Sequence, residues 1–230
     1  MNTLLLRLKG PMQAWGVDSR YTTRSTQEYP SKSGVLGLLA AAQGRRRTDP
    51  LEDLAGLSFG VRTDQPGVLM RDFRTAQNWE TGKSQPLSSR YYLADAIFVA
   101  GISGPERSLA PFREALARPR FPLYLGRRSC PVNPDLFIDI VDQELEIALR
   151  SVPWQASLHH RQSRSQKVHL PIYRDANQDE TGDQVQDVPL SFDSAHRQYG
   201  WRTVYTVLQE VDNPDSTARS DPFFEAVISS

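Results

Sequence analysis

The stretch Tyr124-Leu125-Gly126-Arg127-Arg128-Ser129-Cys130-Pro131 separates a helical pattern, Leu109 to Ala117, from a strand pattern at 136–140. Its glycine lets the backbone turn tightly and approach another group closely. Its two arginines carry planar, permanently charged guanidinium groups, and a seryl hydroxyl follows them. These groups suit phosphates and stacked bases. The alternative interpretation is an ordinary connecting loop whose arginines point into solvent.

On both sides of this stretch, hydrophobic periodicity predicts strands and helices. Leu4, Leu6 and Leu8 share one face of a first strand, and Ser33 is a candidate N-cap for a helix that Gly44 ends. The predicted elements lie at residues 3–8, 34–43, 57–61, 96–102, 109–117 and 136–140. Their order is strand, helix, strand, strand, helix, strand. We therefore expect an α+β fold of the ferredoxin-like or RNA-recognition type (βαββαβ), with both helices on one sheet face and the other face open to a ligand.

The remaining regions predict an insertion and a smaller second part. Residues 64–92 lose the periodic pattern between two strands, so we expect a projecting hairpin or arm, a thumb. We assign residues 1–148 to the first domain and 149–230 to a smaller, mainly β domain. Residues 175–187 are acidic and poor in apolar side chains, which predicts a mobile loop.

Composition limits the function classes. The 230 residues carry a net charge of zero, so a surface for nucleic acid must be local. Residues 1–50 hold eight Lys or Arg against three Asp or Glu, whereas residues 151–230 hold seven against eleven. No apolar run reaches the roughly 20 residues of a membrane span. The N-terminus resembles a strand more than a signal peptide, and the single cysteine, Cys130, agrees with a cytoplasmic location.

Polar and aromatic residues near the N-terminus add candidate contacts. Gln13 or Trp15 could meet a base, although Trp15 is better interpreted as filling the edge of the core. Basic and aromatic residues then alternate loosely, as in single-strand binding surfaces, at Arg20, Tyr21, Arg24, Tyr29 and Lys32. Lys32-Ser33 before a helix does not fit a nucleotide P-loop, because the required glycines would fall at Ser31 and Thr26. A helix N-terminus beside Lys32 still predicts an anion site.

The C-terminal histidines allow an enzymatic hypothesis. His159 or His160, together with Tyr173 or Lys167, could assemble a metal-free ribonuclease site. The favoured interpretation is that the paired histidines touch RNA or a partner without catalysis. One cysteine and four scattered histidines give no zinc-ligand spacing, and no cofactor is predicted.

Three motifs together resemble the fifth family of CRISPR-associated proteins, in its type I-E branch. They are residues 10–16 (GPMQAWG), residues 30–38 (PSKSGVLGL) and residues 124–131 (YLGRRSCP). The resemblance is strong over residues 3–141. It implies a non-catalytic subunit of the Cascade surveillance complex that caps the 5′ handle of CRISPR RNA (crRNA), with a thumb that reaches over the RNA and a backbone subunit. Implied partners are the backbone subunit CasC, the large subunit CasA and, through the complex, target DNA.

The resemblance and the residue patterns together give one set of predicted RNA contacts and no catalytic or metal-binding residue. The set comprises Gln13, Trp15, Arg24, Lys32, Ser33, Arg74, Tyr124, Gly126, Arg127, Arg128, Ser129, Cys130 and His160. Relatives of type I-C cleave precursor RNA, so an endoribonuclease that processes precursor crRNA is the alternative function. A domain that only bridges proteins is a third hypothesis.

Overall fold

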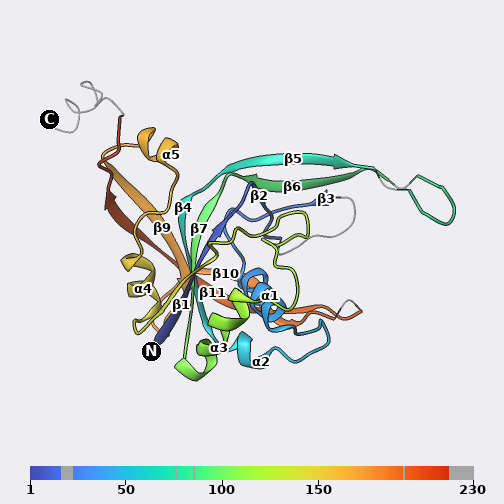
Figure 1. Ribbon diagram of the computed structural model, residues 1–230, viewed down its shortest axis with the longest axis horizontal. Coiled ribbons are helices and arrows are strands. Elements are labelled where there is room, and N and C mark those ends of the chain that lie inside the picture. Colours follow the sequence, from blue (N-terminus) through green and yellow to red (C-terminus); the bar gives the residue numbers. More distant parts are fainter. Residues whose placement is uncertain (17–22, 76, 85, 194, 218–230) are drawn as a thin grey trace.

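The computed structural model describes residues 1–16, 23–75, 77–84, 86–193 and 195–217, and it is built on one large antiparallel sheet (Figure 1). The strand order is β10-β11-β9-β4-β7-β1-β8. The strands are β1 (Asn2–Lys9), β4 (Ser58–Gln65), β7 (Ile97–Gly104), β8 (Phe137–Val141), β9 (Lys167–Asp175), β10 (Asp183–Ser191) and β11 (Gln198–Asp212). A mixed α+β fold with a mainly antiparallel sheet, as predicted, is confirmed.

Few helices accompany this sheet. They are α1 (Lys32–Gln43), α2 (Glu52–Ala55), α3 (Glu106–Ala117), α4 (Leu145–Ser151) and α5 (Leu158–Gln162). Within the part of the chain that the structure describes, no helix is long and apolar enough to cross a membrane.

Strand β1 shows how the sequence divides the core. Leu4, Leu6 and Leu8 lie in the main hydrophobic cluster with residues of α1 and α3. Leu5 points to the opposite face, where it packs with Leu149 of α4. The predicted alternation is therefore confirmed, but the expectation of an open second face is wrong, because α4 covers part of it.

Helix α1 begins two residues earlier than the sequence predicts. Ser31 is the N-cap, and its Oγ accepts a hydrogen bond from the Gly34 amide at 3.2 Å. Ser33, the predicted cap, lies inside the first turn and is buried. Gly44 ends the helix at φ +80°, as expected for a left-handed C-terminal residue.

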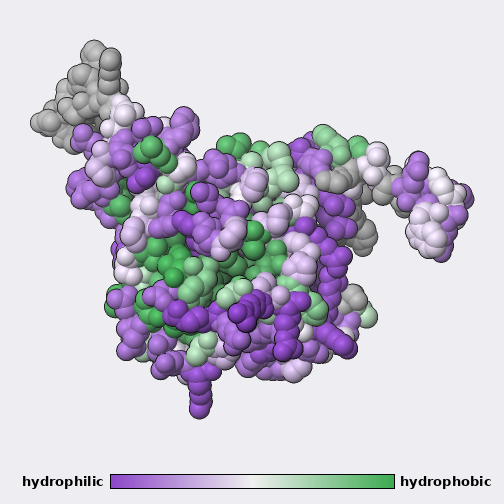
Figure 2. Space-filling model, in the orientation of Figure 1, coloured by the Kyte–Doolittle hydropathy of each residue, from purple (hydrophilic) through white to green (hydrophobic). Residues whose placement is uncertain are grey.

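The insertion between β4 and β7 forms a long hairpin, β5 (Val68–Arg74) and β6 (Ser88–Ala94), which projects from the body (Figure 1). The short strands β2 (Met12–Gln13) and β3 (Thr23–Arg24) pair with the other edge of β6. Figure 2 shows apolar side chains along this hairpin as well as on the body. Its strongly exposed apolar residues are Val68, Leu69, Phe73, Trp79 and Leu87.

Residues beyond 148 extend the same sheet. Strand β9 pairs with β4, so the sheet is continuous across the predicted domain boundary, and the two-domain division stays a prediction. The stretch 175–187, predicted as a loop, includes the first half of β10, which pairs with β11. Some of its acidic residues are ion-paired: Arg174 pairs with Glu180 at 2.6 Å, and Arg202 pairs with Asp187 at 2.5 Å.

Candidate nucleic-acid interface

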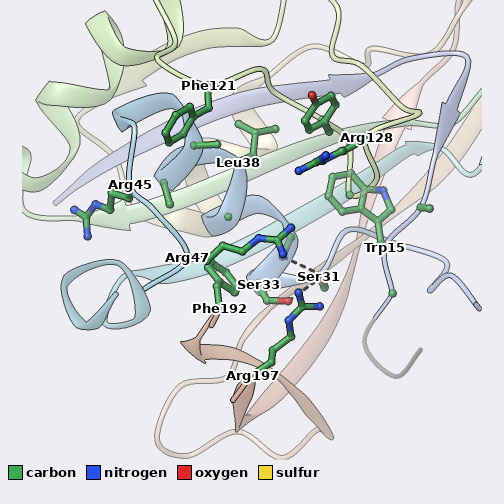
Figure 3. A pocket seen from close by; sticks show the side chains of 18 of the residues that line it. Trp15, Ser31, Ser33, Leu38, Arg45, Arg47, Phe121, Arg128, Phe192 and Arg197 are labelled. Carbon is green, nitrogen blue, oxygen red and sulfur yellow. Dashed lines mark hydrogen bonds between the residues drawn. The ribbon is translucent and has the colours of Figure 1, made fainter. Parts of the chain in front are cut away.

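A groove of about 550 Å³ lies between α1, the loop that carries Gly126 and the turn between β10 and β11 (Figure 3). Its charged lining residues are all arginines: Arg45, Arg46, Arg47, Arg128 and Arg197. Its aromatic lining residues are Trp15, Phe121, Tyr124, Phe192 and Tyr199. No described residue lining this groove is acidic. We call this hollow the arginine groove.

The arginines differ in how far they are already engaged. Arg45 forms a two-pronged ion pair with Asp53, with Nη1 and Oδ1 2.6 Å apart, and its head group points away from the groove in Figure 3. Arg47, Arg128 and Arg197 point into the groove from three different segments. Among the residues that the structure describes, no carboxylate pairs with the side chains of these three or of Arg46. An unpaired cluster of this kind attracts a polyanion.

The loop that carries Gly126 forms one wall of the groove. Gly126 has φ +83°, and a Cβ built on it would lie 1.8 Å from the Ala14 carbonyl oxygen, so only glycine fits. The Leu125 amide donates to the Cys130 carbonyl at 2.7 Å, and the Ala14 amide donates to the Leu125 carbonyl at 3.1 Å. These bonds hold the exposed residues Gly126, Arg128 and Ser129 at the rim.

Arg127 and Arg128, predicted as an equivalent pair, have different surroundings. Arg127 donates from Nη1 to the Tyr91 carbonyl at 3.0 Å and from Nη2 to the Arg24 carbonyl at 3.0 Å. Its guanidinium also lies 4.9 Å from the ring centre of Tyr92. Arg127 therefore ties the loop to the hairpin and to β3, whereas the exposed Arg128 faces the groove.

Gln13 and Trp15 support the site from inside the core. Gln13 is fully buried, and its Nε2 donates to the carbonyl oxygens of Leu8 at 3.0 Å and Ala96 at 2.7 Å. Trp15 is 1% exposed and donates from Nε1 to Oε1 of Gln13 at 3.0 Å. The prediction that Trp15 fills the core is confirmed. Neither side chain is free to take a base, so we keep both as supports and not as RNA contacts.

The N-terminus of α1 is an anion site, as predicted, but the protein itself supplies the anion. Oδ2 of Asp187 accepts a hydrogen bond from the Lys32 amide at 2.7 Å. The Lys32 ammonium lies 3.1 Å from Asp175, and Arg202 bonds both Asp187 oxygens. With Lys32 and Ser33 both buried, this helix end holds β10 in place instead of facing a ligand.

The other predicted contacts are scattered. Tyr124 is half-buried and lines the groove, and the Ser129 hydroxyl lies 3.5 Å from that of Tyr92. Cys130 is 1% exposed, and burial raises the pKa of its thiol, so it is a packing residue. Arg24 is exposed on β3. The side chain of Arg74, like residues Arg20 and Tyr21, lies outside the described part of the chain.

His160 is away from the groove. It lies on α5, well separated from α1 in Figure 1, with its ring edge-on to Trp154 at 6.2 Å. Burial and the neighbouring Arg164 lower the pKa of His160. Both effects favour the neutral form of the side chain over the charged form that would pair with a phosphate.

The sequence interpretation missed Arg46, Arg47 and Arg197 as groove residues. Arg46 and Arg47 follow directly after the end of α1, where basic residues are favourable in any helix, so the run gives no separate signal of a groove. The sequence around Arg197 shows no binding motif. Arg197 lies beside α1 only because β10 and β11 pair and place the turn between them there. The sequence predicted Arg128 alone of this cluster, because the other arginines come from segments that only the fold brings beside it.

An antiparallel sheet with few helices, a groove whose charged lining is all arginine and a loop that turns at Gly126 are the features that comparison with known proteins can place. The match to known families is specific: residues 3–205 match the family described as CRISPR-associated protein (Cas_Cas5), and the chain belongs to this family. The chain is 36% identical over 155 residues to the protein named CRISPR system Cascade subunit CasD of Escherichia coli (strain K12), covering 59% of this chain and 69% of that protein.

Two solved structures resemble the whole chain. One, titled CRISPR RNA-guided surveillance complex, contains a chain with 33% identity and a TM-score of 0.75, covering 99% of this chain and 98% of that one. The other, titled Crystal structure of Cas protein, has 35% identity and a TM-score of 0.70, covering 93% and 97% of the two chains.

Proposed function

We propose that this chain is the non-catalytic subunit of a Cascade surveillance complex that binds and caps the 5′ handle of crRNA. Family membership and the similarity to the E. coli Cascade subunit support the complex. The arginine groove is the observation that supports RNA binding at this surface. All its charged lining residues are cationic, although the net charge of the chain is zero.

The fold suits this role. The order β8-β1-β7-β4, with α1 and α3 packed on one face, supports the ferredoxin-like βαββαβ unit that the sequence predicts. The arginine groove lies where α1 meets the loop before β8. RNA strands bind such proteins through phosphate contacts and through bases stacked on aromatic side chains.

The contacts that we propose follow from exposure and charge. Arg46, Arg47, Arg128 and Arg197 would pair with phosphates, Tyr124 and Phe121 would contact bases, and the Gly126 backbone would let the strand approach closely. Arg24 and Ser129 flank the same rim. Arg127, Lys32 and Ser33 hold the surrounding segments, and His160 belongs to another surface.

The β5–β6 hairpin is the proposed thumb. Trp79 near its tip is 89% exposed and Val68 is 70% exposed, which is costly unless a partner covers them. Arg71 stacks over Phe73 at 4.2 Å, so the hairpin also offers a cation near its apolar side chains. CasC and CasA are the proposed protein partners, target DNA is reached through the complex, and the complex would operate in the cytoplasm.

The ribonuclease alternative finds no assembled site in the described residues. His160 packs against Trp154, Tyr173 stacks on Tyr29 with ring centres 4.0 Å apart, and Lys167 pairs with Glu210 at 2.7 Å. Three of the four candidate catalytic groups therefore have different partners, and His159 is exposed on α5. Incubation with precursor repeat RNA without metal tests the point: site-specific cleavage lost in His159→Ala or His160→Ala would establish the alternative.

Binding of handle-sequence RNA tests the proposal directly. We expect Arg128→Ala to weaken binding by about 1–3 kcal/mol, the range for a lost charge-assisted bond. Arg107→Ala is the matched control, because Arg107 is exposed on α3 and does not line the groove. Equal affinity for handle and scrambled RNA in the wild-type chain would favour the protein-bridging hypothesis.

A further inference from the structure

A second hollow of about 870 Å³ adjoins the arginine groove and shares Gly16, Ser31, Arg197 and Tyr199 with it. Its chemistry is different. Four glutamines line it, Gln27, Gln184, Gln186 and Gln198, together with the aromatic residues Tyr29, Tyr199 and Trp201. We call it the glutamine pocket.

The pocket offers no free negative charge among its described lining residues. Asp187 is its one acidic residue, and that side chain is 1% exposed and bonded by Arg202 and the Lys32 amide. Arg197 is the residue through which the cationic groove continues into the pocket. A strand whose phosphates lie in the groove can therefore place its next base in the pocket without electrostatic repulsion.

The glutamine amides are positioned by the β10–β11 pairing. Gln184 donates from Nε2 to the Thr203 hydroxyl at 2.8 Å, and Gln186 donates from Nε2 to the Tyr199 carbonyl at 3.1 Å. These bonds use one amide hydrogen of each side chain and orient the rest of the group. The side-chain amide of Gln27 makes no hydrogen bond to any described residue, so both its donor and its acceptor are available, while its backbone amide donates to the Trp15 carbonyl at 2.7 Å.

Trp201 supplies a stacking surface beside these amides. It lies opposite Gln186 in the β10–β11 register and is 64% exposed. Tyr29 is held by its stack on Tyr173, with ring centres 4.0 Å apart and an interplanar angle of 11°. Exposed indole beside fixed amides is the combination by which proteins stack and read unpaired bases.

We propose that the glutamine pocket reads one unpaired base of the RNA held in the arginine groove, and that the base it selects is adenine. The base stacks on Trp201, and a glutamine amide bonds the adjacent donor and acceptor of its edge. This assignment rests on the proposed handle binding and adds sequence selection to it. The groove supplies affinity for any strand, whereas the pocket supplies the preference.

The test measures binding of handle-sequence RNAs in which each adenine is replaced in turn. For the wild-type chain we expect one replacement to weaken binding by about 5- to 100-fold, the range for stacking and base-edge contacts. Gln186→Leu and Gln27→Leu should remove this preference and leave binding of the replaced RNA unchanged. Trp201→Ala should weaken binding of the unreplaced RNA. Gln178→Leu is the matched control, an exposed glutamine between β9 and β10 outside the pocket.

The outcomes separate the two proposals. If the wild-type chain binds RNA through the arginine groove but every single-adenine replacement is neutral, the pocket proposal is overturned and the groove stands. If Trp201→Ala changes only the association with other Cascade subunits, the pocket docks a protein and the proposal is again overturned. Absence of RNA binding by the wild-type chain overturns both. If Trp201→Ala does not fold, Trp201→Leu keeps a branched apolar side chain on the strand and removes the stacking surface.

Discussion

Among single residues, adjacent positions of the loop 124–131 have different structural roles. Gly126 allows the backbone to pass against Ala14, Arg127 closes the loop onto the hairpin, and Arg128 is left for a ligand. Adjacent arginines thus act differently because one finds carbonyl oxygens within reach and the next does not. The one-dimensional pattern Gly-Arg-Arg could not distinguish them.

Gly126→Ala should destabilise the chain by clearly more than the ~1–2 kcal/mol that a left-handed backbone costs a non-glycine residue. The added Cβ would also collide with the Ala14 carbonyl. Gly82→Ala is the matched control, because Gly82 has φ +65° and nothing within 4 Å of the added Cβ. Urea unfolding measures both, and equal losses would show that the close approach to Ala14 is not rigid.

Arg127→Ala and Arg128→Ala should separate stability from binding. Loss of the Arg127 hydrogen bonds should lower the free energy of unfolding by about 1–3 kcal/mol, because carbonyl groups lose a charged donor. Arg128→Ala should leave stability within about 0.5 kcal/mol, as for other exposed sites, and should weaken RNA binding. Unfolding midpoints and RNA titrations check this, and the opposite assignment of the two effects would refute the division of roles.

For helices and strands, tertiary contacts decide the element boundaries that the sequence pattern leaves undecided. The helix cap shows this directly, since Ser31 and Ser33 are both suitable residues and only the structure places Ser31 at the cap. Ser31→Ala should cost about 1 kcal/mol. Ser33→Ala should cost less, since its hydroxyl caps no amide. Thermal unfolding of the two variants decides the matter, and a larger loss for Ser33→Ala would place the cap where the sequence predicted it.

The β9–β10 connection predicts a pH dependence. The ion pair with Arg174 lowers the pKa of Glu180 to about 2 from its ordinary 4.5. Burial raises the pKa of Glu146, but hydrogen bonds and ion pairs with Arg174 and Arg150 lower it by more, so the pKa of Glu146 is below its ordinary value. Because the folded-state values are depressed, the stabilisation is fully present above about pH 4.5 and is lost as pH falls toward 2.

Glu180→Gln should therefore lower the Tm at pH 7 and reduce its fall between pH 5 and 2. The neighbouring exposed Asp179→Asn serves as control. A Tm-against-pH curve for Glu180→Gln that runs parallel to the wild-type curve would show that this ion pair does not contribute to acid unfolding.

The six predicted elements were found because leucine, valine and phenylalanine recur with clear periods. Helix α4 was missed because its seven residues carry an exposed Ile147 next to buried Ala148 and Leu149, which blurs a period of 3.6. Strand β10 was missed because its buried Asp187, which pairs with Arg202 on β11, stands where an apolar residue would have marked the strand. Long-range charge pairing of this kind leaves no local pattern.

Over the whole molecule, the basic residues fall into two groups. One group forms ion pairs with carboxylates inside the fold, and the other lines the arginine groove without an acidic partner among the described residues. The acidic C-terminal half neutralises Lys32, Arg174 and Arg202 internally. Arg46, Arg47, Arg128 and Arg197 then remain for the groove. A net charge of zero is thus compatible with a strongly cationic surface, which the total charge alone could not predict.

The salt dependence of RNA binding tests this central claim most directly. Each phosphate contact on a single strand contributes about 0.7 to the slope of log K against log salt concentration. The combined variant Arg46→Ala, Arg47→Ala, Arg128→Ala should therefore reduce the magnitude of that slope by about 2. Removal of three exposed arginines outside the groove, Arg107, Arg113 and Arg118, should leave it unchanged. An unchanged slope in the groove variant, or an equal reduction in the control, would contradict the assignment of RNA to the arginine groove.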